Sequence, residues 1–501
     1  MMIDNSFNLI DEPWIPIANV GRVSLAQVFR DTSYRALGGN PIQKISLTKL
    51  LLAIVQAACT PEDNEAWEKL GIEGLARNCL NYLEKHHDKF YLYGEKPFLQ
   101  MPEISKAATQ SIGAVLPEIA TGNTTVLNAL QIEKQSNDAD KALLIVQLMG
   151  FGLGGKKTDN SIVLSIGYSG KSNEKDKPSS GKAGTSLGFM GFLHNFLQGK
   201  SFLETLWLNL LTHEQIRNLA YANGLGVAPW ENMPKGEQCE MANILQSSLM
   251  GRLLPLSRFC LLNNSGLHYS EGIAHLDYKS GLNDPSLAIN FVSKPAKVLW
   301  VDTERRPWRF LTALLSFMEV NSGGFECLHV KLGLLRARKV IPQVGLWSGG
   351  LRVSSNAGEQ YVSGSDDFVE SVTFMDSSYL GEIWYGNLKV EMAGLDQLSK
   401  IVYSATMNYY KSQKADGKKQ AAMASNLFWQ MAEHKFQDLV NACGLGTEQI
   451  GALRKFFVHF ASTAYYTYCP NDTARQLNAW AENLPNFNKY LKSGIQPEAK
   501  T

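Results

Sequence analysis

The last quarter of the chain carries the clearest hydrophobic pattern. Apolar residues recur at spacings of three and four in residues 395–413, 419–440, 447–468 and 472–492, as in a helix that buries one face. Short connectors containing glycine, or proline with candidate N-cap residues, separate these stretches. The pattern predicts an antiparallel four-helix bundle over residues 386–501. Pro485 should kink or end its last helix.

Before residue 386 the pattern mixes strands and helices. Phe90–Met101 places aromatic residues around a glycine-containing turn, which is typical of strands. Ser46–Cys59 is mostly apolar and predicts a buried helix with Ser46 as its N-cap. We therefore predict an α+β protein, with a large mixed domain over residues 1–385 followed by the bundle.

Composition narrows the class of protein. The 501 residues are 45% hydrophobic and 19% charged, which is ordinary for a globular protein with a large core. The net charge of +1 means that any nucleic-acid contact must come from local basic patches. Seven cysteines without a C-x-x-C pair favour reduced thiols over a zinc ribbon. The acidic start lacks the form of a signal peptide, and apolar runs such as Leu51–Cys59 are too short to span a bilayer, so we expect a cytoplasmic protein with no membrane partner.

A glycine segment, Leu148–Thr158, nearly matches a phosphate-binding P-loop, G-x-x-x-x-G-K-[ST]. Lys157 occupies the place of the hydroxyl residue that would bind magnesium. A working P-loop also needs a strand before it, whereas Asn137 and Asp138 predict the start of a helix that runs up to the glycines. Asp302 follows a short apolar run in Lys297–Glu304, like the aspartate that helps to bind magnesium in such enzymes. A nucleotide-dependent enzyme that uses this segment with Asp302 is nevertheless the weaker alternative.

The number of glycines in this segment allows two other interpretations. A single glycine is enough to end a helix, but four occur here within six residues: Gly150, Gly152, Gly154 and Gly155. They could simply end the helix. Alternatively, they let the backbone approach a nucleic acid closely, with Lys156 and Lys157 binding phosphates. In the second case, bulky residues at Gly152 and Gly154 would weaken DNA binding more than they weaken the assembly of this chain with its protein partners.

A second basic stretch lies at Lys331–Gln343 and has no acidic residue. Its basic residues are Lys331, Arg336, Arg338 and Lys339. They could form a solvated face or contact phosphates or a groove. No catalytic constellation accompanies either basic region, since His86–Asp88 has no second metal-binding cluster and no G-x-S-x-G elbow occurs. We therefore expect a protein that is not an enzyme and needs no cofactor or metal.

Several segments together resemble a known family in their order and spacing. They are Asn8–Ile17, Phe90–Gln100, Leu116–Leu127, Gly251–Leu262, the glycine segment and the helical C-terminal region. They resemble the CasA family, the large subunits of the type I-E CRISPR surveillance complex Cascade. The resemblance implies a non-catalytic antiviral subunit that recognises the protospacer-adjacent motif in double-stranded DNA. It also implies help in opening the duplex for the guide RNA, contacts with the other Cascade subunits, and recruitment of the helicase–nuclease.

The resemblance also assigns site residues. The family's glycine loop falls on Gly150, Gly152, Gly154 and Gly155, and its lysine finger falls between His275 and Lys279, of which Lys279 better suits a minor-groove acceptor. The family's wedge falls near Ala337, Arg338 and Lys339. A loop that contacts the guide RNA and DNA falls on Asn123, Thr124, Thr125, Val126, Leu127 and Asn128.

One more basic cluster lies in a connector of the predicted bundle. Its lysines are Lys411, Lys414, Lys418 and Lys419. They could bind phosphates of the displaced strand or serve only solubility. A purely structural scaffold for the RNA complex is a further alternative for the whole chain.

Overall fold

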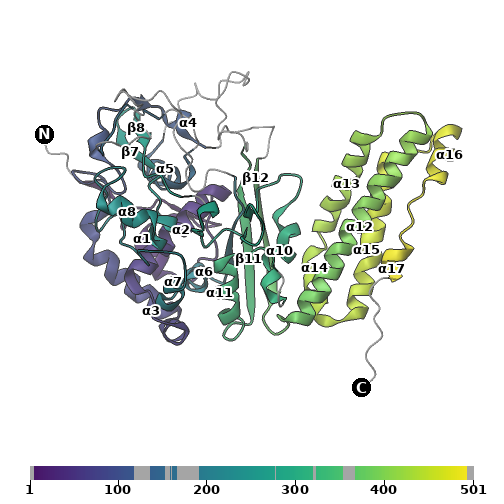
Figure 1. The fold of residues 1–501 in the computed structure, drawn as a ribbon, viewed down its shortest axis with the longest axis horizontal. Helices are drawn as coiled ribbons and strands as arrows, with labels where there is room; N and C mark the ends of the chain where they lie inside the picture. Colours follow the sequence, from purple (N-terminus) through teal and green to yellow (C-terminus); the bar gives the residue numbers. More distant parts are fainter. Residues whose placement is uncertain are drawn as a thin grey trace. The chain divides into compact units, whose positions relative to one another are not determined.

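The computed structural model describes residues 5–117, 136–152, 158–159, 161–165, 191–276, 278–319, 323–353 and 367–492 (Figure 1). The chain divides into two compact units. The larger unit comprises Met1–Trp308, Gly323–Val340 and Val344–Val372, and the smaller unit comprises Arg309–Ser322, Ile341–Gln343 and Thr373–Thr501. Helices and short sheets alternate in the larger unit, so the predicted α+β class is confirmed.

The helices of the larger unit are mostly short. They are α1 (Leu25–Arg30), α2 (Pro41–Cys59), α3 (Asn64–Lys85), α4 (Ile112–Val115), α5 (Asp138–Phe151), α6 (Phe202–Asn209), α7 (His213–Arg217), α8 (Glu240–Gln246), α9 (Leu249–Leu253) and α11 (Leu328–Ala337).

Helix α2 lies in the core of the larger unit. It begins at Pro41 because Asn40 and Gln43 form a capping box and proline fits the first helical position. The predicted N-cap, Ser46, is instead a buried residue inside the helix, where its hydroxyl donates to the Ile42 carbonyl over 2.8 Å. The helix is therefore longer than its apolar run. By length and composition alone α2 could cross a membrane, but 72% of its most apolar window is buried in the protein, as in a core helix.

Small antiparallel sheets accompany these helices. The strands are β1 (Ser6–Asn8), β2 (Ile15–Ile17), β3 (Gly21–Val23), β4 (Tyr91–Tyr93), β5 (Thr109–Gln110), β6 (His194–Gln198), β7 (Arg258–Asn263), β8 (Gly266–Glu271), β9 (Ile289–Asn290), β10 (Lys297–Val298), β11 (Gln343–Leu351) and β12 (Phe368–Asp376). Two sheets have three strands, in the orders β12-β11-β6 and β5-β8-β7, and the others are two-stranded pairs. Strand β4 confirms the strand expected in Phe90–Met101.

The smaller unit is helical apart from the residues that it shares with β11 and β12. Its helices are α10 (Leu311–Leu314), α12 (Glu382–Ser412), α13 (Lys418–Glu433), α14 (Phe436–Leu445), α15 (Thr447–Tyr468), α16 (Ala474–Glu482) and α17 (Asn488–Lys492). Helix α15 has the predicted bounds. Helix α12 begins before the proposed domain boundary at residue 386, because Trp384 and Tyr385 already bury their side chains.

Two of the four predicted bundle helices are interrupted. The second is divided at His434–Lys435 into α13 and α14, and the last is divided into α16 and α17 with Pro485 between them, as expected from the missing proline N–H. A buried ion pair joins the two longest helices of the smaller unit: the Nε of Arg454 on α15 donates to Oε2 of Glu391 on α12 over 3.0 Å. This hydrogen bond raises the pKa of Arg454, so both charges are retained.

Candidate nucleic-acid interface

One short segment, Leu254–Ser257, connects two of the predicted DNA-binding regions. On one side, the Ser257 N–H donates to the Met149 carbonyl near the end of α5 over 2.9 Å. On the other side, Ile273 N–H donates to the Leu256 carbonyl, also over 2.9 Å. The structure thus brings the start of the glycine segment close to the chain that follows β8. We call residues 272–286, without Asp277, the anchored loop.

The first half of the anchored loop is held by two polar side chains. Arg252 is 1% exposed, and its Nη1 donates to the Leu276 carbonyl over 2.9 Å. Gln246 Nε2 donates to the Ala274 carbonyl over 2.8 Å. Gly272 is required at the crossing, because a Cβ there would lie 2.1 Å from the Leu256 carbonyl oxygen. The backbone of this half is therefore fixed.

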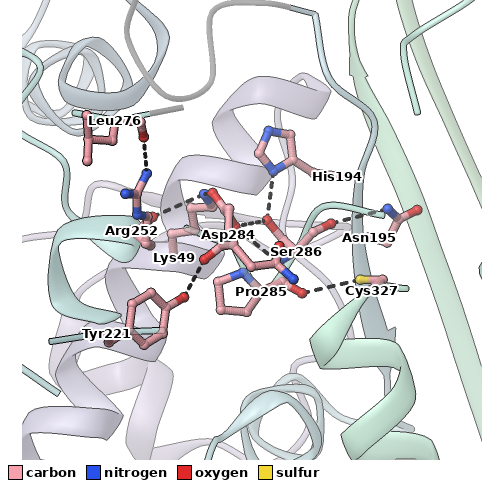
Figure 2. A network of polar contacts seen from close by, with 11 residues as sticks. Lys49, His194, Asn195, Tyr221, Arg252, Leu276, Asp284, Pro285, Ser286 and Cys327 are labelled. Carbon is pink, nitrogen blue, oxygen red and sulfur yellow. Dashed lines mark hydrogen bonds and ion pairs between the residues drawn. The ribbon is translucent and has the colours of Figure 1, made fainter. Parts of the chain in front are cut away.

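A buried polar network holds the second half (Figure 2). Lys49 Nζ lies 2.5 Å from Asp284 Oδ2 and donates to the Arg252 carbonyl over 3.2 Å. Tyr221 Oη donates to the Asn283 carbonyl over 2.5 Å. Burial alone would raise the pKa of Asp284, but the Lys49 ammonium holds that pKa well below its usual range. Asp284 is therefore a carboxylate that ties the loop to α2.

The same network orients a neutral histidine. Asp284 Oδ1 accepts from the Ser286 hydroxyl over 2.7 Å, and His194 Nδ1 lies 2.8 Å from that hydroxyl oxygen. Because the hydroxyl proton points to the carboxylate, Nδ1 of His194 is the donor. Burial lowers the pKa of His194 to about 3, so its ring is neutral at pH 7.

The anchored loop exposes one of its two candidate groove-reading residues. Lys279 is exposed in a single 3-10 turn, Tyr278–Ser280, and its Nζ lies 6.0 Å from the centre of the Tyr278 ring. Tyr278 in turn packs edge-on against Phe192. His275 is instead half-buried, with Nε2 2.6 Å from the Pro255 carbonyl oxygen. Burial lowers the pKa of His275 to about 3, so it offers no positive charge. Of the two, only Lys279 is placed to reach a partner.

Both flanks of the glycine segment are tied to the β7–β8 hairpin. On the first flank, Arg258 Nη2 donates to the Gly152 carbonyl over 3.3 Å. On the second, the Asp159 N–H donates to the Tyr269 carbonyl over 2.9 Å. The Ser270 hydroxyl donates in return to the Asp159 carbonyl. The described residues on both sides of the segment therefore contact the hairpin from which the anchored loop also emerges. Several predicted residues lie outside the described residues: Gly154, Gly155, Lys156, Lys157 and the guide-RNA loop Asn123, Thr124, Thr125, Val126, Leu127 and Asn128.

The surroundings of the glycines do not match those of a P-loop. Helix α5, capped by Asn137, precedes the glycines, which confirms the predicted helix. Asp302 is exposed in a turn after the two-residue strand β10, and its Oδ1 accepts from Glu304 N–H over 2.9 Å. A P-loop requires a strand directly before the glycines. Within the described ranges, no three His, Cys, Asp or Glu side chains gather in a way that could hold a metal ion.

Gly150 and Gly152 should respond differently to substitution. A Cβ at Gly152 would lie 2.5 Å from Arg258 Cγ and 2.8 Å from Tyr269 Oη, whereas one at Gly150 would meet only Pro255 Cγ, at 3.7 Å. We expect Gly152→Ala to lower the free energy of unfolding by about 1–3 kcal/mol through overpacking. Gly150→Ala, inside α5, should be neutral or stabilising by up to about 1 kcal/mol. Urea unfolding of the two variants tests this, and equal stabilities would contradict it. Weaker DNA binding by a bulky residue at Gly152 would therefore not by itself identify a groove contact.

The second basic stretch separates into buried and exposed residues. Arg336 is buried, donates to the carbonyls of Leu208 (3.1 Å) and Leu210, and lies 4.3 Å from the Trp67 ring centre. Burial lowers its pKa to about 9. Its assignment to DNA is therefore corrected: Arg336 ties α11 to α6 and α3. The sequence could not separate it from its neighbours, because a basic residue facing the core looks the same in a sequence as one facing solvent.

Arg338 and Lys339 are exposed at the end of α11. Within the larger unit, α11 lies at the lower end in Figure 1, and α5, β7 and β8 lie at the upper end. In this view α11 therefore lies apart from the hairpin β7–β8, which precedes the anchored loop in the chain.

The connector lysines of the smaller unit are all exposed. They are Lys411, Lys414, Lys418 and Lys419, in and beside the turn from α12 to α13. Arg475 joins this end of the bundle by donating to the Gln413 carbonyl, a contact that its distance from the lysines in the sequence does not predict. The cluster remains compatible with phosphate binding or with solubility.

Comparison with known proteins gives a consistent family assignment. The model of the family "CRISPR-associated protein Cse1" matches residues 8–483. A CRISPR-associated protein CasA/Cse1 from Thermus thermophilus is 34% identical over 132 residues, which are 24% of this chain and 26% of that protein. The aligned part thus spans about a quarter of this curated relative.

Solved structures share the fold over nearly the whole chain. Cse1 of Thermobifida fusca has a TM-score of 0.76 at 20% identity, covering 97% of this chain and 98% of that chain. CasA of Thermus thermophilus has a TM-score of 0.73 at 19% identity, covering 97% and 99%. A chain of a CRISPR RNA-guided surveillance complex has a TM-score of 0.70 at 15% identity, covering 96% and 99%.

Proposed function

Because this chain belongs to the CRISPR-associated Cse1 family, we propose that it reads the protospacer-adjacent motif of double-stranded target DNA. Cse1 is the large subunit of the Cascade surveillance complex. In this role the chain acts without catalysis. It binds the motif, helps to open the duplex so that the guide RNA can pair, and recruits the helicase–nuclease.

The observation that carries the proposal is the anchored loop with Lys279. Arg252 holds the first half of the loop and Lys49 holds the second half. Lys279 is exposed between these two attachment points. A lysine on a fixed loop enters a groove without the entropy cost of ordering that loop. The minor groove offers acceptors at every base pair and few distinguishing groups. A lysine that reads it would accept several related motifs.

The position of the glycine segment is a second argument for a DNA-binding surface around Lys279. Gly152, on its first flank, contacts the hairpin β7–β8 through Arg258. The anchored loop contacts the segment Leu254–Ser257, which directly precedes that hairpin. A backbone without side chains at this place would approach a groove closely. The lysine and the bare backbone would then read the groove from one side of the protein.

The test is DNA binding by the reconstituted complex with guide RNA, with and without this chain. We expect the chain to make binding depend on the motif, so that target DNA with an altered motif binds more weakly. Under the alternative of a scaffold, the chain would raise affinity equally for DNA with and without the motif. Hydrolysis of ATP by the purified chain would contradict the non-catalytic role.

Lys279→Gln should weaken motif recognition specifically. We expect the complex to bind motif-containing DNA more weakly by about 1–3 kcal/mol and to discriminate less between motifs, as for a lost base contact. The matched control is Lys69→Gln, which removes an exposed charge from α3. Equal weakening for all motifs, with a shallower salt dependence, would instead identify a phosphate contact. An unchanged affinity would show that Lys279 is not part of the interface.

A further inference from the structure

A separate cavity lies in the larger unit, over the sheet β12-β11-β6. Its volume is about 340 Å³, within the range of small-molecule sites. Residues from α2, β6, β11 and β12 and the segment Arg35–Leu37 line it. It shares no lining residue with the anchored loop or the glycine segment, so the proposed DNA recognition does not account for it.

The floor of the cavity is an aromatic surface held in one orientation. The Trp347 ring covers Gly349, where a Cβ would lie 2.7 Å from the ring carbons. Phe196 pairs with Trp347 across β6 and β11, and their ring centres are 6.1 Å apart. The indole Nε1 donates to Glu370 Oε2 over 3.2 Å. Since backbone and a carboxylate both restrain it, the indole is a preformed platform.

The charge of that carboxylate is balanced within the cavity. Lys44 Nζ donates to both oxygens of Glu370, over 2.9 and 2.7 Å. The pair is half-buried, with 21% of the Lys44 side chain and 40% of the Glu370 side chain exposed. Glu370 therefore orients Trp347 without making the cavity repel an anion.

Arg35 and Gln198 are polar side chains of the lining that remain available for a ligand. Arg35 is exposed, and its guanidinium has no hydrogen-bond or ion-pair partner in the described part of the chain. Gln198, at the end of β6, likewise has a side-chain amide without a partner among the described residues. A guanidinium binds phosphate in a bidentate manner, and an amide both donates and accepts.

We propose that this cavity binds a nucleotide, with its base stacked on Trp347, its base edge hydrogen-bonded to Gln198 and its phosphate held by Arg35. Stacking on an aromatic ring suits any base. Paired donor and acceptor groups on the Gln198 amide match the edge of a base. An aromatic side chain of a partner protein would fill the floor but would leave Arg35 without an anion. The source is either a free mononucleotide or one unpaired nucleotide of a strand.

The test uses the purified full-length chain and isothermal titration calorimetry. The probes are AMP, CMP, GMP, UMP, adenosine and a single-stranded RNA hexamer. We expect Arg35→Gln to weaken the binding of phosphate-bearing probes about tenfold, as for a lost charge-assisted contact, and to leave adenosine binding unchanged. Arg30→Gln, an exposed arginine outside the cavity, is the charge-matched control and should change nothing.

Variants of the platform complete the test. Trp347→Leu should weaken every probe about tenfold or more, and Trp347→Phe should retain most of the binding because it keeps an aromatic face. Arg35-dependent binding of mononucleotides identifies the free nucleotide as the source, whereas such binding by the hexamer alone identifies a strand.

The proposal is overturned if no probe saturates, if Arg35→Gln binds every probe like the wild type, or if N-acetyltyrosinamide binds as well as the tightest nucleotide probe. Because the chain is tested without the complex, none of these results bears on motif reading by Lys279.

Discussion

Replacing Lys49 with methionine is expected to lower the free energy of unfolding of the larger unit by about 3–5 kcal/mol, because Asp284 would become a buried charge without its partner. The two side chains are only 8% and 4% exposed. Urea unfolding measures the loss of stability. Hydrogen exchange should also become faster in peptides that cover the anchored loop, since the ion pair ties that loop to α2.

A second substitution separates the charge from the change in packing. Lys49→Met combined with Asp284→Asn removes both charges and keeps an oxygen that can accept from the Ser286 N–H, as Asp284 Oδ1 does over 3.0 Å. We expect the double variant to recover most of the lost stability. We also expect Lys49→Met to discriminate less between motifs although Lys279 is intact, because the loop that carries Lys279 is loosened, and the double variant to restore this discrimination. If Lys49→Met is as stable as the wild type, the ion pair does not hold the loop.

Lowering the pH from 7 to 5 should destabilise the larger unit through three histidines. Burial lowers the pKa of His194, of His275 and of His329 to about 3, from an ordinary value of 6.5. Between these values the unfolded chain binds one more proton than the folded chain at each site. The stabilisation is therefore complete above pH 6.5 and is lost as the pH falls toward 3. Once the pH is well below 6.5, each histidine contributes a slope of about 1.4 kcal/mol per pH unit, or about 4 kcal/mol per unit together.

His194→Asn tests this pH dependence. Asparagine keeps a donor for the Ser286 hydroxyl but does not titrate. We expect the slope of unfolding free energy against pH between 5 and 6 to fall by about 1.4 kcal/mol per unit, measured by urea unfolding at each pH. An unchanged slope would mean that folded His194 titrates with its ordinary pKa. Asp284 adds a further loss at lower pH, because its pKa lies below the ordinary 3.8 and its stabilisation disappears as the carboxylate is protonated.

The hydrophobic pattern predicted the helical region well where one helix face decides the structure. Helix α15 matches the prediction because apolar residues recur along its whole length and Gly446 precedes it. The break between α13 and α14 was missed, because the apolar repeat continues across His434 and Lys435. The hydroxyl of Ser46 suits an N-cap, but the capping box of Asn40 starts the helix more than one turn earlier.

The candidate interface was predictable in part. The resemblance left the lysine finger between His275 and Lys279, and residue type favoured Lys279; the structure exposes Lys279 and half-buries His275. Lys49 was overlooked as a site residue, although a lone lysine inside the apolar stretch Ser46–Cys59 is unusual and indicates a buried partner. That partner, Asp284, is distant in sequence, and no local pattern connects the two.

The sequence by itself determined the family, the α+β class, the helical C-terminal region and the basic residues available for a nucleic acid. Periodicity, capping and turn residues act over a few positions, so they can be read from the chain. Only the tertiary structure decided which basic residues face the core, as Arg336 does, and which face solvent, as Lys279 does. Only the structure paired Lys49 with Asp284 and placed Arg35 and Trp347 in the lining of one cavity. Burial and charge pairing depend on residues far apart in the sequence, and folding alone brings them into contact.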